Sequence, residues 1–184
     1  MIDGLTFGWG LFFVTEATGK LNLRRVAMMA RMTKYKTKLT ENKRVVLEKE
    51  FSGNYPTLSY AIKSPDDAAT IGKEFMRIHE EPEEYMYMIC MNVKNKVIGV
   101  FEISHGTVNA SLVSPREAFQ KALLANAVSV IFLHNHPSGD SSPSREDIEV
   151  TKRLTEAGKI LGVEVLDHII IGERYTSLKE KGYL

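Results

Sequence analysis

Two histidines that are two residues apart, His134 and His136, end an apolar run and open a loop rich in proline, glycine and serine. In an extended strand, residues i and i+2 point to the same side, so both imidazoles can face one metal ion. Pro137, Gly139 and Pro143 allow the chain to reverse after the pair. A His-x-His pair occurs often by chance, so a metal site needs a further ligand.

The segment after the loop is expected to be a helix, and it carries that ligand. Ser144 and Asp147 are three residues apart, so they project from the same helical face. Two imidazoles and one carboxylate on zinc leave a fourth position for water, which is typical of catalytic sites. Zinc lowers the pKa of such a water from ~16 to about 7. We therefore predict a zinc site at His134, His136 and Asp147, although this set does not exclude iron or manganese.

A hydrolytic site also needs a general base and a group that stabilises an oxyanion. Glu102 is the best candidate for the base, because it lies in the apolar run VIGVFEIS, where a carboxylate is costly without a partner. Ser144 could donate its hydroxyl to the developing oxyanion. The structural alternatives are a solvent-facing strand residue for Glu102 and a helix cap for Ser144.

The elements that would position these residues can be read from Ser64 onward. Capping serines, each followed by proline or acidic residues, and helical periodicity predict three helices over 64–79, 114–127 and 144–161. In the last helix one face is expected to carry Ile148, Thr151, Leu154, Gly158 and Leu161. Apolar and alternating runs predict strands over 83–93, 97–104, 107–113, 127–133, 164–172 and 174–182. Mixed strands with helices between them indicate a layered α/β domain.

Composition sets further limits on the kind of protein. The chain has 184 residues and one cysteine, Cys90, which excludes an internal disulfide and a thiolate zinc cage and suits a reducing compartment. The apolar stretch GLTFGWGLFFV is too short to span a bilayer and lacks the basic flank of a secretory signal. We therefore expect a cytoplasmic protein that does not bind a membrane.

The N-terminal third is basic. Residues 20–50 contain ten Lys and Arg against three Glu, a balance of +7. Such a segment could contact DNA or an acidic partner, and the ordinary alternative is a solvated helix or loose tail. We assign residues 1–60 to a basic arm and 61–184 to the hydrolase domain. Met32 is an alternative start, in which case residues 1–31 would be a gene-model extension.

The motif resembles that of a known family. His134, His136, Pro137, Ser144 and Asp147 match the H-x-H-P…S-x-x-D pattern of the JAMM (MPN+/JAB) metallopeptidases, and Glu102 is taken as their upstream glutamate. Roughly residues 62–184 resemble the bacterial RadC family, historically called DNA repair proteins. The phrases that carry this second resemblance are GTVNASLVSPREAFQKALLANA, HNHPSGDSSPSREDIEVTKRL and LDHIIIG.

The resemblance implies a cytidine-deaminase-like, three-layer α/β/α fold with a mixed sheet. It implies one zinc ion per chain held by His134, His136 and Asp147, and hydrolysis of a peptide or isopeptide bond in a protein substrate. Glu102 would act as the base, and Ser144 would assist the oxyanion. Asn135, Pro137 and Gly139 are expected to shape the loop. His168 is expected either to support a zinc ligand or to be a hydrogen-bonded core residue.

Two other functions remain open at this point. Longer RadC proteins carry an N-terminal helix-hairpin-helix module, and residues 1–60 lack its glycine-rich hairpins. The chain could nevertheless be a DNA-associated accessory protein with a structural zinc site, using the basic segment 20–50. A metal-dependent nuclease on the same centre is the third function. The sequence does not indicate the physiological substrate or the oligomeric state.

Overall fold

The computed structural model describes residues 30–55, 58, 61–106 and 113–184 of the chain. Within these residues, seven strands form one mixed sheet in the order β2-β1-β4-β3-β5-β6-β7. The strands are β1 (Ala30–Leu39), β2 (Val45–Tyr55), β3 (Tyr85–Met91), β4 (Val97–His105), β5 (Ser129–Asn135), β6 (Glu164–Ile171) and β7 (Tyr175–Ser177). The helices are α1 (Pro65–Glu74), α2 (Pro115–Leu124), α3 (Arg145–Leu161) and the short 3-10 helix η1 (Ile78–Glu80).

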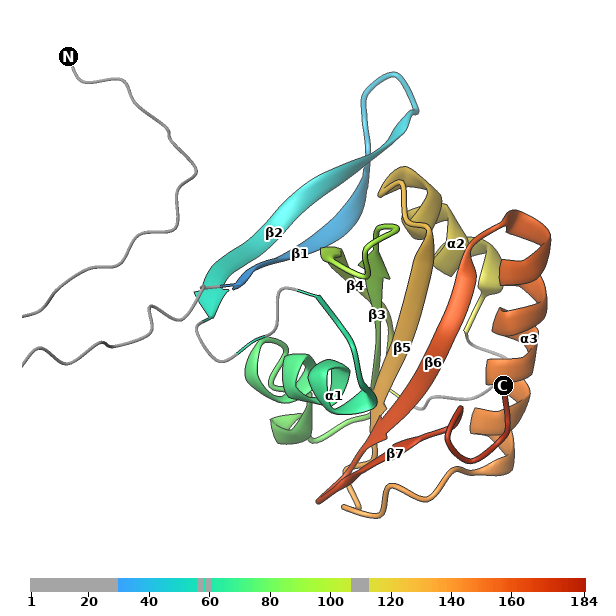
Figure 1. Cartoon of the computed structure of the whole chain (residues 1–184). Helices are drawn as coiled ribbons and strands as arrows, with labels where there is room; N and C mark the ends of the chain where they lie inside the picture. The colour runs from blue at the N-terminus through green and yellow to red at the C-terminus, as the bar shows by residue number, and fades with distance from the viewer. Residues whose placement is uncertain (1–29, 56–57, 59–60, 107–112) are drawn as a thin grey trace, which may run out of the picture.

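Helices cover both faces of the sheet, with α1 on one face and α2 and α3 on the other (Figure 1). Each face has its own apolar core. Ile71 of α1 packs with Ile89 and Leu133 on the first face, and Phe119 of α2 packs with Phe132 on the second. Strand pairs β1–β4 and β5–β6 are parallel, and the other four pairs are antiparallel. The predicted three-layer α/β/α fold with a mixed sheet is therefore confirmed.

Strand β5 lies inside the sheet and carries the first histidine. All seven of its residues are buried, as the continuous apolar run predicts for a strand covered on both faces. Ile131 and Leu133 point toward the α1 layer, while Phe132 points toward α2 and α3. Because side chains alternate along a strand, His134 points into the α2/α3 layer at the end of β5.

Helix boundaries follow the capping signals. Ser64 and Ser144 each form a reciprocal capping box, with Asp67 and Asp147, whereas the Ser114 side chain only accepts from the Glu117 amide. The predicted hairpin of β3 and β4 is present. The first helix ends at Glu74 rather than residue 79, because the chain turns at Arg77, which adopts a left-handed φ of 53°. Residues 107–112, most of one predicted strand, lie outside the described residues.

The buried face of α3 is rotated from the predicted one. Asp147, Val150, Thr151, Leu154 and Gly158 are buried. Ile148 is only half-buried, and Leu161 at the end of the helix is 44% exposed. Thr151, Leu154 and Gly158 are thus buried as predicted, while Asp147 is an unexpected polar residue on the face that packs on the sheet.

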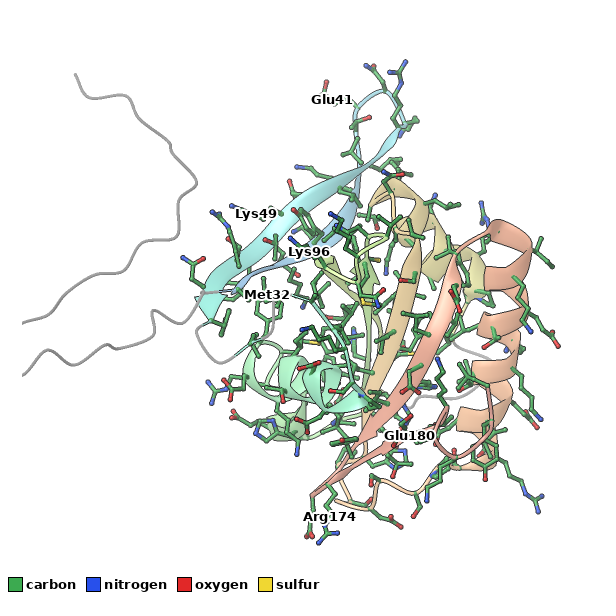
Figure 2. All side chains as sticks on the ribbon, viewed as in Figure 1. Met32, Glu41, Lys49, Lys96, Arg174 and Glu180 are labelled. Carbon is green, nitrogen blue, oxygen red and sulfur yellow. The ribbon has the colours of Figure 1, made fainter. Side chains whose placement is uncertain are left out.

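The basic N-terminal segment is regular where it is described. Strands β1 and β2 form an antiparallel hairpin, and β1 joins β4 through a short parallel register at Lys34 and Tyr35. Met32 is 1% exposed in the α1-side core, and its side chain lies where the hairpin meets the body of the domain, whereas Glu41 marks the hairpin tip (Figure 2). The expectation of a loose tail or solvated helix was therefore wrong for residues 30–55.

One sheet includes strands from both sides of residue 60, where the sequence analysis divides the arm from the hydrolase domain. That domain boundary stays a prediction. The hypothesis about a start at Met32 concerns residues 1–31, of which 1–29 lie outside the described residues. Among the described helices, none has the length and apolar character needed to cross a lipid bilayer.

Candidate metal centre

The three predicted ligands converge on one point between the sheet and α3. Nε2 of His134 lies 3.1 Å from Oδ1 of Asp147, and Nε2 of His136 lies 3.4 Å from Oδ2 of the same carboxylate. The two Nε2 atoms are 3.0 Å apart. Donor atoms bound at ~2.0–2.1 Å around a tetrahedral ion are separated by about 3.3 Å. The spacing therefore fits a metal ion, and these side chains form a group that could hold one.

Local backbone structure fixes where each ligand lies. His136 follows β5, and its amide donates to the carbonyl of Ile171 at the end of β6, 2.9 Å away. Gly139 adopts a φ of +84° and turns the chain back toward α3, as expected for a residue without a Cβ. A Cβ at Gly172 would lie 2.2 Å from the Gly139 carbonyl oxygen, so the loop packs directly on the end of β6.

Asp147 is presented by the capping box of α3. Its Oδ2 accepts from the Ser144 amide at 2.7 Å, and its amide donates to the Ser144 hydroxyl at 3.1 Å. The structural role considered for Ser144 is thus observed. The Ser144 side chain lies at the exposed start of the helix, and its role at an oxyanion stays a prediction.

The ring of His136 has one tautomer set by its surroundings. Its Nδ1 lies 2.6 Å from the backbone carbonyl of Asp140. A carbonyl oxygen only accepts hydrogen bonds, so Nδ1 carries the proton. In the neutral ring, Nε2 then has no proton, and its lone pair faces Asp147 and His134 and is available to a metal ion. This arrangement is the one that metal-binding histidines require.

Asp147 and His136 shift each other's pKa in opposite directions, because each favours the charged form of the other. Burial raises the pKa of Asp147, but the close contacts of its carboxylate with the His134 and His136 rings outweigh burial and hold that pKa well below its usual range. The hydrogen bond with Asp147 raises the pKa of His136, while burial lowers it and the charge of Glu84 adds to the rise. Asp147 is therefore ionised at neutral pH and available as a ligand.

His168 lies directly behind His134. It is fully buried on β6, and its Nε2 is 2.8 Å from Nδ1 of His134. Its other ring nitrogen lies 2.6 Å from the Thr151 hydroxyl. Burial holds the pKa of His168 well below the ordinary histidine value. His168 thus contacts a predicted ligand from the side opposite the cluster.

Asn135 stands between the two histidines and ties the end of β5 to the start of β3. It is 1% exposed. Its Oδ1 accepts from the Tyr85 amide at 2.7 Å, and its Nδ2 donates to the Glu83 carbonyl at 2.9 Å. The side chain therefore braces residues 83–85 against β5, which is more specific than the loop-shaping role expected from the sequence.

The structure does not bring Glu102 to the cluster. Its carboxylate pairs with Lys34 at 3.1 Å and with His105 at 3.0 Å. It lies opposite Tyr87 in the β3–β4 ladder, and Tyr87 belongs to the α1-side core. Burial raises the pKa of Glu102, but the contacts with Lys34 and His105 outweigh burial. The pKa of Glu102 therefore lies below the ordinary glutamate value. Glu102 faces the layer opposite the one that contains His134.

Glu84 is the carboxylate that the sequence analysis missed. Met86 pairs with His134 in the antiparallel β3–β5 ladder. Extending this register by two residues sets Glu84 opposite His136 and on the same face as Met86. The contribution of Glu84 to the raised pKa of His136 agrees with this position. The available signal was a glutamate immediately before an apolar strand that neighbours the histidine strand.

A cleft of about 490 Å³ opens beside His136. It is lined by Lys73, His79, Glu81, Pro82, Asn135, His136, Pro137, Gly139, Ile171, Gly172 and Glu173. The side chain of His136 is 14% exposed, whereas that of His134 has no exposure. A substrate in the cleft would therefore approach the cluster from the His136 side. A separate pocket of about 180 Å³ contains Glu102.

The fold and the converging ligand set define a JAB-type α/β domain, and family comparison agrees with this class. Residues 62–183 match the family described as RadC-like JAB domain. The chain therefore belongs to the RadC-like JAB domain family.

Relatives of the chain carry the name UPF0758 protein. One from Caldanaerobacter subterraneus subsp. tengcongensis is 44% identical over 174 residues, covering 94% of this chain and 71% of its own length. That match therefore extends into residues 1–31. Relatives from Bacillus cereus and Bacillus anthracis are 54% identical over 126 residues, or 68% of this chain. The chain spans about half the length of these Bacillus proteins, 55% in each case.

The brace at Asn135 leads to a stability prediction. Asn135→Ala leaves the Tyr85 amide and the Glu83 carbonyl without their side-chain partner, so the free energy of unfolding should fall by about 1–3 kcal/mol. Urea unfolding followed by circular dichroism measures this change. Ser138→Ala, in the exposed part of the same loop, should change it by less than about 0.5 kcal/mol. Equal stability of both variants would show that Asn135 does not brace the site.

Proposed function

We propose that this protein is a zinc-dependent hydrolase that cleaves a peptide or isopeptide bond. The observation that carries the proposal is the convergence of His134, His136 and Asp147, whose ligand atoms, one from each residue, all lie within 4.8 Å of one another. Membership of the RadC-like JAB domain family supports the same class of activity.

Zinc is the metal that this ligand set favours. Two imidazoles and one carboxylate are the protein ligands of several catalytic zinc sites, which keep one position open. A zinc ion at these residues would supply a water of lowered pKa, from ~16 to about 7, and would polarise the carbonyl that this water attacks. The partial exposure of His136 beside the cleft leaves the approach that such a site needs.

Glu84 is the general base in this proposal, in place of Glu102. Its register sets it opposite His136 on the cluster's face of the sheet, and Asn135 holds the backbone on either side of it. From there Glu84 can take a proton from the attacking water and return it to the leaving amine. The Ser144 hydroxyl, exposed at the start of α3, donates to the developing oxyanion.

The substrate is proposed to be a peptide segment or a lysine-linked branch that lies in the cleft beside His136. Prolines and Ile171 give the cleft an apolar lining, while Lys73, Glu81 and Glu173 add charges of both signs. Both charges and apolar surface suit a polypeptide, which presents amides, side chains and terminal charges together.

The DNA-associated alternative depends on the basic segment, which is a hairpin over residues 30–55. Within it Lys36 and Lys38 pair with Glu48, and Lys34 pairs with Glu50. These contacts offset part of the positive charge that would attract a phosphate backbone. A DNA-accessory role or a nuclease role stays a prediction, and nicking of plasmid DNA that depends on His134 would favour the nuclease.

Substitution of the two glutamates separates the candidate bases. Glu84→Gln should reduce hydrolysis by about 100-fold or more, because the proton of the attacking water loses its acceptor. Its zinc content should not change, since Glu84 is not one of the three ligands. The measurement is cleavage of a library of peptides and lysine-branched peptides by the zinc-loaded proteins.

Glu102→Gln is the matched control in that experiment. It removes the same charge from the opposite face of the sheet, and it should leave the cleavage rate close to that of the wild type. Loss of activity in Glu102→Gln with retention in Glu84→Gln would reverse the assignment. Full activity in both variants would show that neither glutamate is the base.

Zinc affinity should depend on pH through His136. The ring must lose its proton to bind zinc, and Asp147 raises its pKa above the ordinary value of about 6.5. Affinity should therefore fall about tenfold per pH unit below that raised pKa. Asp147, whose pKa is lowered, stays ionised over this range. Competition titrations with a chelator between about pH 5 and pH 8 measure the effect.

The metal-free protein should show the opposite trend. A folded-state pKa above the unfolded value adds stability that is complete below about pH 6.5 and is lost as pH rises through the folded pKa. Acidification from above the folded pKa of His136 down to about pH 6.5 should thus stabilise the metal-free form while it weakens zinc binding, and below about pH 6.5 the lowered pKa of the buried His168 has the opposite effect on stability. For the zinc titration, a zinc dissociation constant that does not change with pH would contradict the assignment of His136 as a ligand.

A further inference from the structure

A chain of hydrogen bonds connects two of the proposed ligands through the interior of the domain. The Thr151 hydroxyl lies 2.5 Å from the backbone carbonyl of Asp147. The same hydroxyl lies 2.6 Å from Nδ1 of His168. Nε2 of His168 lies 2.8 Å from Nδ1 of His134. Thr151, His168 and His134 are each 0% exposed, so water does not compete for these contacts.

The direction of every proton in this chain follows from its fixed end. The Asp147 carbonyl can only accept, so the single hydroxyl proton of Thr151 points to it. The Thr151 oxygen must then accept from His168, which places the His168 proton on Nδ1. In the neutral His168 ring, Nε2 accepts, so Nδ1 of His134 carries the proton. Nε2 of His134 is left unprotonated, 3.1 Å from the Asp147 carboxylate.

We propose that Thr151 and His168 are positioning residues that hold His134 in the Nδ1-protonated tautomer, with Nε2 directed to the metal. The inference rests on the proposed metal site and adds to it the device that prepares one ligand. His136 needs no such chain, because the Asp140 carbonyl fixes its ring directly. Nδ1 of His134 instead meets Nε2 of His168, so its ring depends on a second imidazole, which itself has two tautomers until Thr151 selects one.

The surroundings of His168 keep the chain rigid. Its backbone amide donates to Oδ1 of Asp167 at 2.7 Å, and its ring packs edge-on against Phe132 with centroids 6.2 Å apart. Thr151 is one helical turn after Asp147, so the first turns of α3 supply both a ligand and the group that orients another ligand. This explains why the buried face of α3 includes a threonine one turn after Asp147.

Removing the Thr151 hydroxyl releases the tautomer choice. In Thr151→Val, His168 can place its proton on Nε2 and donate to Nδ1 of His134. The neutral His134 ring then carries its own proton on Nε2, where it would point at Asp147 and block metal binding. Zinc affinity should consequently fall by about 10- to 100-fold, the usual effect of losing a partner that orients a metal-binding histidine.

Two further variants separate this role from a general effect on α3. Thr151→Ser keeps the hydroxyl and should restore zinc affinity close to the wild-type value. Thr155→Val is the matched control, because the Thr155 hydroxyl donates to the Thr151 carbonyl at 2.9 Å, one turn along the same helix, in an equivalent i to i−4 bond. It should bind zinc as the wild type does. Thermal unfolding of all four proteins shows whether each one is folded.

Tautomers are measured directly by nitrogen-15 NMR of histidine-labelled protein in the metal-free state, without reference to catalysis. The proposal requires the Nδ1–H form of His134 in the wild type and a shift toward the Nε2–H form in Thr151→Val. An Nε2–H form of His134 in the wild type, or zinc affinity in a folded Thr151→Val equal to that of Thr155→Val, would overturn it. Because peptide cleavage is not measured, failure of the proposed activity leaves this test intact.

Discussion

The Asp147 carboxylate and the His134 imidazole are buried against each other where α3 begins and β5 ends, at 2% and 0% exposure. An ionised carboxylate is costly in such a place unless charge and hydrogen bonds compensate it. Here the capping box of Ser144, two imidazoles and the start of a helix all act on the same group. The N-terminus of α3 must therefore meet the end of β5, and the loop between them is shaped by that requirement.

The rest of the site follows from this contact. Gly139 turns the loop back at a φ of +84°, and the absence of a Cβ at Gly172 allows the loop to lie on the end of β6. Asn135 extends the arrangement in the other direction by tying the start of β3 to the same strand. The proposed ligands come from β5, its loop and α3, while the groups that hydrogen-bond to them come from α3, β6 and the loop backbone. The site thus depends on the parallel β5–β6 pair and the helix between these two strands.

Local patterns were enough to predict the cluster of His134, His136 and Asp147 and most elements from Ser64 onward. The spacing of His134 and His136 on a strand, and of Ser144 and Asp147 on a helix, depends only on local periodicity. Capping residues fixed where the helices begin, and the apolar run before His134 identified a buried strand. The fold class follows from the same elements, because strands buried on both faces need helices on both sides.

Positions that depend on non-local register could not be predicted. In β4, Ser104 pairs with Met86, but Glu102 pairs with Tyr87, so Ile103 is an extra residue in a bulge. A bulge reverses which face the following side chains occupy. Without it Glu102 would share the face of Ser104, which is the face of His134, and the predicted base would have pointed toward the cluster. The β1–β2 hairpin was missed for a related reason, since β1 is secured by a parallel contact with β4 some 66 residues away along the chain.

The claim on which the account depends is that His134, His136 and Asp147 hold a metal ion. The most direct test is elemental analysis of the purified full-length chain, expressed with zinc supplied, beside a His134→Ala/His136→Ala variant that is shown to be folded. The account predicts about one zinc ion per chain in the wild type and none in the variant. A wild-type protein that holds no metal, or a variant that holds as much as the wild type, would contradict it.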